Sequence, residues 1–191
     1  SQHLTRHELD DEISERAFNT FIDRLDPMKL YFLQGDIDAF QTEKTGIDDM
    51  LKSGDLQFAH DVFLKYMSRM EESIAVIHGL IDAEHDYGVE EYISTDWDNL
   101  AFAKSREDLT DRWRKRIKYN FLVLKGDKTE GEAARERLHR RYNSQLKQMQ
   151  QTQSDELLEI FLTAVTTSYD PHTTYMSPTT SENFEIQMRL N

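Results

Sequence analysis

Ser144 and Lys147 stand three residues apart, the spacing at which a lysine activates a serine nucleophile in serine–lysine acyl enzymes. That chemistry needs the serine at a strained helix start, with a desolvated lysine beside it. Here both residues lie in a polar, glutamine-rich helical stretch, where the Lys147 ammonium would be solvated and protonated. We therefore expect a solvent-facing helix at this position, and we assign no catalytic residue.

A second spacing is typical of metal sites. Glu136 and His139 form the Glu-x-x-His element that carboxylate-bridged metal sites take from helical bundles. Such a site needs a second copy of the element and two further glutamates. The nearest match is Asp82 with His85, which has aspartate where glutamate is required. We therefore expect polar residues on exposed helices here, with no metal and no cofactor.

Two basic stretches interrupt an otherwise acidic chain. Residues 112–118 and 135–141 are rich in arginine and lysine, but the formal net charge is −13. A negative overall field repels phosphates, so we expect no nucleic-acid partner. The simplest interpretation is a solvated face whose cations pair with nearby acids. A docking face for another acidic domain remains the alternative.

The composition predicts a helical protein. The chain has 191 residues, of which only 7 are glycine and 3 are proline, and its short β-branched runs argue against a sheet. No apolar run approaches the roughly 20 residues of a membrane span, so no span is expected. The absence of cysteine from the sequence excludes disulfides and thiolate chemistry.

Apolar residues recur at three- and four-residue steps over most of the chain. They predict helices over residues 5–25, 36–51, 55–87, 105–124, 129–151 and 154–169. Capping boxes are expected at Thr5–Glu8 and Thr129–Glu132, a terminating glycine at Gly88, and a cap at Ser154. The fold class is therefore all-α, a multi-helix bundle of about six to eight helices with one long central helix and an extended C-terminal linker.

Residues 90–99 form an acidic, irregular loop in this prediction, because they show no helical or alternating period. Tyr92, Ile93 and Trp97 are the expected anchors of that loop.

The C-terminal stretch holds two of the three prolines. Asp170-Pro171 is expected to stop the last helix, as Asp26-Pro27 stops the first, because a residue before proline is pushed out of the α region. Each pair is followed by tyrosine and phenylalanine in the same pattern, D-P-x(3)-Y-x(8)-F. Chance or a shared turn is the simplest account of this repeat. We predict a helical domain over residues 1–169 and a linker over residues 170–191.

The chain resembles the N-terminal region of the tail-specific (carboxy-terminal processing) proteases. The similar segments are His3–His7 with Leu9–Glu12, Leu25–Pro27 with Leu30–Leu33 and Asp36-Ile37, Leu109 with Trp113–Arg116, Arg141-Tyr142, and Asp170–Pro178 leading into Phe184–Met188. The last segment is the most specific, because its D-P-H-[ST]-x-Y element recurs just ahead of the PDZ domain in this family.

The resemblance implies a multidomain serine endopeptidase, typically periplasmic in Gram-negative bacteria. Its PDZ domain takes the substrate C-terminus, its protease domain carries a Ser–Lys dyad, and a helical C-terminal domain often follows. No position of this chain matches the catalytic motifs, so the resemblance transfers no catalytic residue.

The function implied is a non-catalytic domain that scaffolds the PDZ and protease domains of the same polypeptide. It would shape access for protein substrates with apolar C-termini, and an adaptor protein is a further expected partner. The candidate inter-domain or linker residues are Asp170, Pro171, His172, Thr173, Tyr175, Phe184 and Met188. Core packing is the alternative role for the aromatic ones. An independent helical adaptor module without proteolysis is the alternative function.

Overall fold

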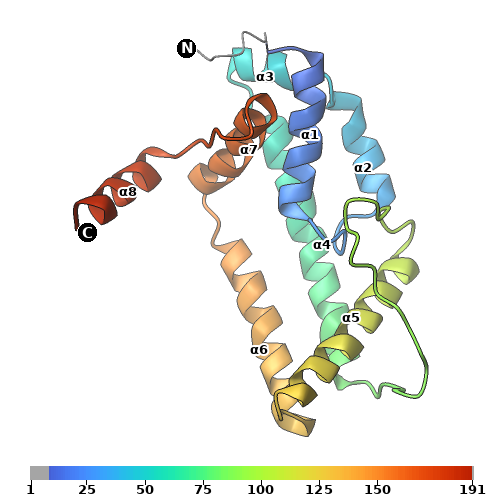
Figure 1. Ribbon diagram of the computed structural model, residues 1–191. Coiled ribbons are helices and arrows are strands. Elements are labelled where there is room, and N and C mark those ends of the chain that lie inside the picture. The colour runs from blue at the N-terminus through green and yellow to red at the C-terminus, as the bar shows by residue number, and fades with distance from the viewer. Residues whose placement is uncertain (1–8, 191) are drawn as a thin grey trace. The chain divides into compact units, whose positions relative to one another are not determined.

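The computed structural model describes residues 9–190, apart from the side chains of residues 179, 183, 187, 189 and 190. Over this range the all-α fold class is confirmed, and the one β feature is a parallel bridge between Leu33 and Ala103. The helices are α1 (Asp11–Leu25), α2 (Gln34–Phe40), the 3-10 helix η1 (Gln41–Glu43), α3 (Ile47–Ser53), α4 (Gln57–Asp82), α5 (Arg106–Gly126), α6 (Gly131–Gln150), α7 (Ser154–Tyr169) and α8 (Pro178–Leu190) (Figure 1). None of the helices described is both long and apolar enough to cross a membrane.

The chain divides into two compact units, each assembled from segments that are distant in sequence. The first unit comprises Ser1–Pro27, Ala39–Phe63 and Thr152–Asn191. The second comprises Met28–Asp38 and Leu64–Gln151. Helix α4 starts in the first unit and continues in the second.

Aromatic rings form the core of the first unit, where α1 packs against α7 and α3. Phe21 is fully buried, and its ring meets that of Phe161 edge to face, with 5.1 Å between the centroids. Phe58 contacts both rings. A polar contact joins α1 to α3, since the Ser14 hydroxyl donates to Asp48 Oδ1 at 3.1 Å and accepts from the Asp48 amide at 3.0 Å. Burial of the large rings is the main stabilising term in this unit.

The second unit is built around Trp113 of α5. Its ring lies 5.5 Å from that of Tyr31 and 5.7 Å from that of Tyr142, measured between centroids. The indole N–H donates to the Leu30 carbonyl at 2.7 Å, and Asn120 donates to the Tyr142 hydroxyl at 2.9 Å. These polar edges are therefore satisfied inside the core, as buried polar groups must be.

Several helix ends differ from those predicted. Helix α1 begins at Asp11, and the Asp10 carboxylate caps it by accepting from the Ile13 amide at 3.0 Å; the cap predicted at Thr5–Glu8 lies outside the described residues. The longest helix ends at Asp82, so the predictions of Tyr87 as its end and Gly88 as its cap were wrong. The acidic residues around this end provide a reason, because carboxylates are unfavourable at the negative end of a helix.

Three other predicted helices differ from the structure in their extent or their cap. The second predicted helix is divided into α2, η1 and α3, with Gly46 immediately before α3. The capping box expected at Thr129–Glu132 is absent, because α6 begins at Gly131 after Glu130 without a side-chain cap. The capping residue of α7 is Gln153 rather than Ser154, and its amide donates to Glu156 Oε2 at 3.0 Å.

The C-terminal segment is irregular over residues 173–177 and then helical from Pro178, and this last helix was missed. The signal was present in the sequence. Proline is favoured at the first position of a helix, and the preceding Ser177 accepts from the Thr180 amide at 3.2 Å in the manner of an N-cap.

Candidate functional site

A row of polar side chains on α7 holds the chain that follows this helix. Glu159, Thr163 and Thr167 are spaced four residues apart and therefore share one face. The Thr167 hydroxyl donates to the Thr173 carbonyl at 3.3 Å, and the Thr163 hydroxyl donates to the Tyr175 carbonyl at 3.2 Å. The earlier residue of α7, Thr163, contacts the later residue, Tyr175. Residues 173–175 therefore run antiparallel to α7. We call these three α7 residues and their contacts the α7 ladder.

Glu159 is the α7 ladder residue that contacts the start of α8. Its Oε2 atom accepts from the Thr180 hydroxyl at 2.7 Å and from the Ser177 amide at 3.3 Å. Burial raises the pKa of the Glu159 carboxyl, but the hydrogen bonds from Thr180 and Ser177 outweigh it, so the pKa lies below its ordinary value. Glu159 therefore stays ionised and holds the first turn of α8.

Asp170 makes the turn between α7 and the ladder. Its amide donates to the Thr166 carbonyl at 2.9 Å, which closes α7 as predicted. Its side chain accepts from the His172 amide at 3.0 Å, and its carbonyl accepts from the Thr173 amide at 2.9 Å. Pro171 sits inside this turn, where its fixed φ angle is accommodated.

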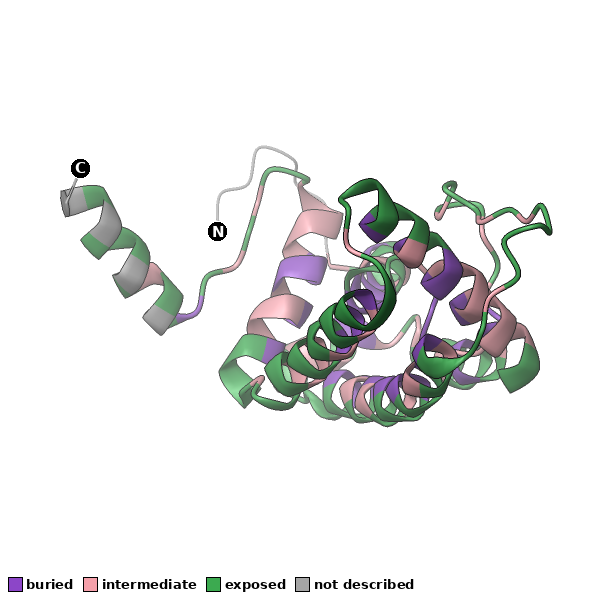
Figure 2. Ribbon diagram, turned by 90° about the horizontal axis from the view of Figure 1, so that it is seen from below, coloured by how far each residue is buried: buried purple, intermediate pink, exposed green. Residues whose placement is uncertain are grey.

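Helix α8 exposes apolar side chains. The exposed fractions are 49% for Phe184, 56% for Ile186 and 65% for Met188. In Figure 2 the residues of α8 that carry a burial colour are almost all in the colour of exposed residues. Phe184 and Met188 are four residues apart and share a face. Large exposed apolar groups that lie together are typical of an interaction surface.

The predicted inter-domain residues thus fall into two sets. The first set forms the turn after α7 and the irregular segment that runs back along this helix, and it is held largely through backbone groups; it comprises Asp170, Pro171, His172, Thr173 and Tyr175. Phe184 and Met188 lie on α8 with exposed side chains. Their inter-domain role stays a prediction. The α7 ladder and Ile186 were missed, although the Glu-Thr-Thr spacing of four was readable in the sequence.

The repeated D-P-x(3)-Y-x(8)-F pattern does not give the same environment twice. In the first copy Tyr31 is buried and the Phe40 ring packs against Phe58. In the second copy Tyr175 is half-buried and Phe184 is exposed. Both copies end a helix at aspartate, but the tyrosine is buried only in the first copy and the phenylalanine is exposed only in the second.

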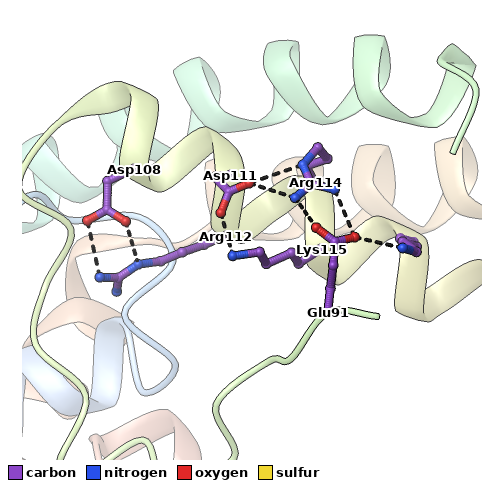
Figure 3. A network of polar contacts seen from close by, with 7 residues as sticks. Glu91, Asp108, Asp111, Arg112, Arg114 and Lys115 are labelled. Carbon is purple, nitrogen blue, oxygen red and sulfur yellow. Dashed lines mark hydrogen bonds and ion pairs between the residues drawn. The ribbon is translucent and has the colours of Figure 1, made fainter. Parts of the chain in front are cut away.

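A network of ion pairs anchors the loop between α4 and α5 to α5 (Figure 3). Glu91 accepts from both terminal nitrogens of Arg114 and from Lys118 at 2.7 Å. Asp111 pairs with Arg114 and with Lys115 at 2.6 Å. The interpretation of the first basic stretch as cations paired with nearby acids is thus confirmed for these residues.

The network keeps Glu91 ionised. Hydrogen bonds from Arg114 and then Lys118 lower the pKa of its carboxyl from 4.5 to about 2, and Glu91 in turn raises the pKa of Arg114. Backbone groups of the same loop are bound too, since Lys118 donates to the Val89 carbonyl and Lys29 donates to the Trp97 carbonyl, both at 2.9 Å. The loop lacks regular structure, as predicted, but it is fixed at several points.

One predicted anchor of this loop is wrong, because the Tyr92 side chain is 78% exposed and its hydroxyl bonds to Glu90. Ile93 and Trp97 are half-buried.

The two metal-type spacings do not converge on one site. His139 contacts Asp82 at 2.9 Å and His78 at 2.6 Å. Glu136 instead pairs with Arg140, and His85 bonds to the Leu80 carbonyl. Among the described residues no group of three histidine, aspartate or glutamate side chains could hold a metal ion. Ser144 and Lys147 are both exposed on α6.

The fold and the site together define a class of protein, an all-α domain whose last described helix is anchored at its start and presents apolar side chains. Residues 1–179 match the family model for the tail specific protease N-terminal domain. The chain is also 32% identical over 190 residues to the tail-specific protease of Haemophilus influenzae. The aligned region covers 99% of this chain and 27% of that protein. The chain belongs to the tail-specific protease N-terminal domain family, and it spans about a quarter of the length of that relative.

Proposed function

We propose that this chain is the non-catalytic helical N-terminal domain of a tail-specific serine endopeptidase, and that it scaffolds the PDZ and protease domains of the same polypeptide. The observation that carries the proposal is the α7 ladder, which fixes the start of α8 and leaves Phe184, Ile186 and Met188 exposed. The family membership supports it, because the chain spans 27% of the length of a relative that is named as a tail-specific protease.

The energetics of α8 favour a docking role within the polypeptide. Fully burying a side chain of the size of Phe or Met stabilises a contact by about 1.5 to 3 kcal/mol, and Phe184 and Met188 share one face of α8. A domain tethered directly after α8 binds at a high effective concentration and needs little further affinity. The occupant we propose for this apolar face is therefore the PDZ domain that follows in the family.

Catalysis in this proposal lies outside the chain. A Ser–Lys dyad in the protease domain cleaves proteins that are recognised by apolar C-termini, with an adaptor protein as a further partner. The site of action is the periplasm of a Gram-negative bacterium. The N-terminal domain shapes the path by which an unstructured substrate reaches that dyad.

Replacing Phe184 and Met188 together with serine in the longer polypeptide tests the role of α8. We expect lower peptidase activity on an unstructured protein with an apolar C-terminus, and easier proteolysis of the segment around α8, because the docking contact is lost. The matched control is Leu122→Ser, which changes an apolar residue of α5 that is also 49% exposed. Unchanged activity and unchanged proteolysis in the double variant would contradict the docking role.

The 191-residue chain itself is expected to show no peptidase activity on the same substrate. Activity above background in the purified chain would contradict the placement of catalysis elsewhere.

An independent helical adaptor module is the second candidate, because exposed apolar residues on α8 also suit a partner protein in trans. The reading frame beyond Asn191 separates the two functions. A PDZ-like stretch followed by a domain with serine and lysine motifs supports the protease, whereas a stop codon supports the adaptor.

A further inference from the structure

A small cavity in the second unit combines apolar walls with positive charge. It lies between α5 and the loop that precedes it, and its volume is about 100 Å³. Leu30, Ile93, Trp97 and Leu100 supply apolar and aromatic surface. A share of about 30 Å³ per water molecule means room for about three waters, or for one small aliphatic side chain.

Three cations of α5 line the same cavity, and the lining holds no carboxylate. Arg112 is paired with Asp108, and Lys115 is paired with Asp111. Arg116 differs from both, because no described carboxylate forms an ion pair with it. Its guanidinium lies 5.7 Å from the centre of the Trp97 ring, and its Nη2 atom lies 3.3 Å from the Met28 sulfur. The cavity therefore offers one uncompensated guanidinium beside an apolar space.

The walls are held in place before any ligand binds. The Lys29 ammonium donates to the Trp97 carbonyl at 2.9 Å and to the Asp98 carbonyl at 3.3 Å. Arg112 donates to the Ala101 carbonyl at 2.9 Å. Fixing both sides of the loop reduces the entropy lost on binding, which favours a preformed site.

We propose that this cavity binds the C-terminus of a polypeptide, with the α-carboxylate on Arg116 and the last apolar side chain against Trp97 and Leu100. An arginine fork matches a carboxylate in charge and geometry. An apolar cleft with one placed charge is the usual form of a small-ligand site. The inference rests on the proposed function, to which it adds a second contact for substrate or partner tails within this domain.

The charge and the volume favour a peptide end over other anions. The net charge of −13 repels nucleic acids and anionic membranes, which carry many charges, far more than it repels a single carboxylate. A fatty acid offers the same carboxylate on a longer acyl chain, so competition with a fatty acid is needed to distinguish the two ligands. The end of a peptide supplies one charge and one short apolar group.

Fluorescence anisotropy of the purified 191-residue chain with a short labelled peptide that ends in leucine tests the site directly. We expect saturable binding of the free acid, and at least about tenfold weaker binding of the same peptide as its C-terminal amide, because the amide removes the charge that Arg116 recognises. Equal binding of acid and amide, or no binding up to about 1 mM, would overturn the proposal.

Substitutions locate the binding within the molecule. Arg116→Gln is expected to weaken binding of the acid by about tenfold or more. Ile93→Glu places a negative charge in the lining and is expected to weaken it similarly. The matched control is Arg106→Gln, which removes an exposed arginine of the same helix outside this cavity and is expected to bind like the parent. If circular dichroism shows that both cavity variants are folded and both bind the peptide like the parent, the proposed binding site is wrong.

Competition separates the two sources of a carboxylate. Decanoate is expected not to displace the labelled peptide, whereas an unlabelled peptide acid is expected to displace it. Displacement by decanoate would assign the cavity to fatty acids and overturn the peptide assignment. These measurements need no protease activity, so their failure would leave the docking role of α8 to be judged by its own test.

Discussion

Asp36 is a carboxylate buried at the start of α2, with 7% of its surface exposed. Arg69 of α4 donates to both of its oxygens, at 2.8 and 2.9 Å, and the Leu33 amide donates to one of them at 2.9 Å. Burial raises the pKa of the Asp36 carboxyl, but the Arg69 and Leu33 hydrogen bonds outweigh it, so the pKa lies below its ordinary value. Asp36 is therefore ionised, and it ties α2 to α4 within the second unit.

Asp36→Ala is expected to lower the free energy of unfolding by about 3 kcal/mol, because it leaves Arg69 largely buried without its main partner. Urea denaturation followed by tryptophan fluorescence measures the change. Asp38→Ala on the exposed side of the same helix is the control, and we expect a change within about 0.5 kcal/mol. Equal losses in the two variants would show that the pair is not a specific stabilising contact.

The ion pairs of Glu91 predict a dependence on pH. The folded-state pKa of Glu91 is lowered to about 2 from an ordinary 4.5, so its ionised form stabilises the folded state. That stabilisation is fully present above about pH 4.5 and is lost as the pH falls towards 2. We expect the stability gap between the parent and Glu91→Gln to be constant near neutrality and to shrink over this window. Urea titrations at several pH values measure it, and a gap that widens on acidification would contradict the assignment.

At the scale of elements, the α7 ladder decides how the chain leaves the helical domain. Asp170 stops α7, Thr167 and Thr163 hold the returning backbone, and Glu159 receives the first turn of α8. The ladder uses backbone carbonyls and amides, so most of its contacts do not depend on the side chains of residues 173–177. A short irregular segment is thereby given a defined course.

Glu159→Ala is expected to free this end of the ladder. The Ser177 amide loses its acceptor, and hydrogen bonds to charged groups contribute about 1.5 to 3 kcal/mol, so its hydrogen exchange is expected to accelerate by roughly ten- to a hundredfold. Amide exchange resolved by NMR measures this. Glu84→Ala removes the same charge from an exposed site in the second unit and is expected to leave the Ser177 amide unaffected. An unchanged exchange rate of the Ser177 amide in Glu159→Ala would show that Glu159 does not hold this amide.

At the scale of the whole molecule, each of the two compact units contains an aromatic core. Phe21, Phe58 and Phe161 belong to the first unit, whereas both tryptophans of the chain, Trp97 and Trp113, belong to the second. Tryptophan fluorescence therefore reports on the second unit, while far-ultraviolet circular dichroism reports on all helices. This separation allows the stability of the units to be compared in one sample.

Phe21→Ala is expected to cost about 3 to 5 kcal/mol, because it removes a fully buried ring from the core of the first unit. Since Phe21 lies in the first unit and Trp113 in the second, the midpoint seen by circular dichroism is expected to fall further than the midpoint seen by fluorescence. The same urea titration read by both signals measures the difference. Transitions that remain coincident would show that the two units unfold as one.

Much of the secondary structure follows from the sequence alone. The three- and four-residue spacing of apolar side chains is a local property, and it predicted the helices that became α1, α4, α5, α6 and α7. The Asp-Pro steps predicted the ends of α1 and α7, because proline restricts the residue before it whatever the surroundings. The family was likewise readable from short segments and is confirmed over residues 1–179.

Only the tertiary structure decided which distant groups meet. Glu91 with Arg114, Lys29 with the Trp97 carbonyl, and Arg116 with the Trp97 ring are separated by many residues, and no local spacing encodes their partners. The same holds for exposure, since one D-P-x(3)-Y-x(8)-F copy buries its tyrosine and the other leaves its phenylalanine exposed. Periodicity is set by neighbours along the helix, whereas burial and charge pairing depend on the segments that pack against it.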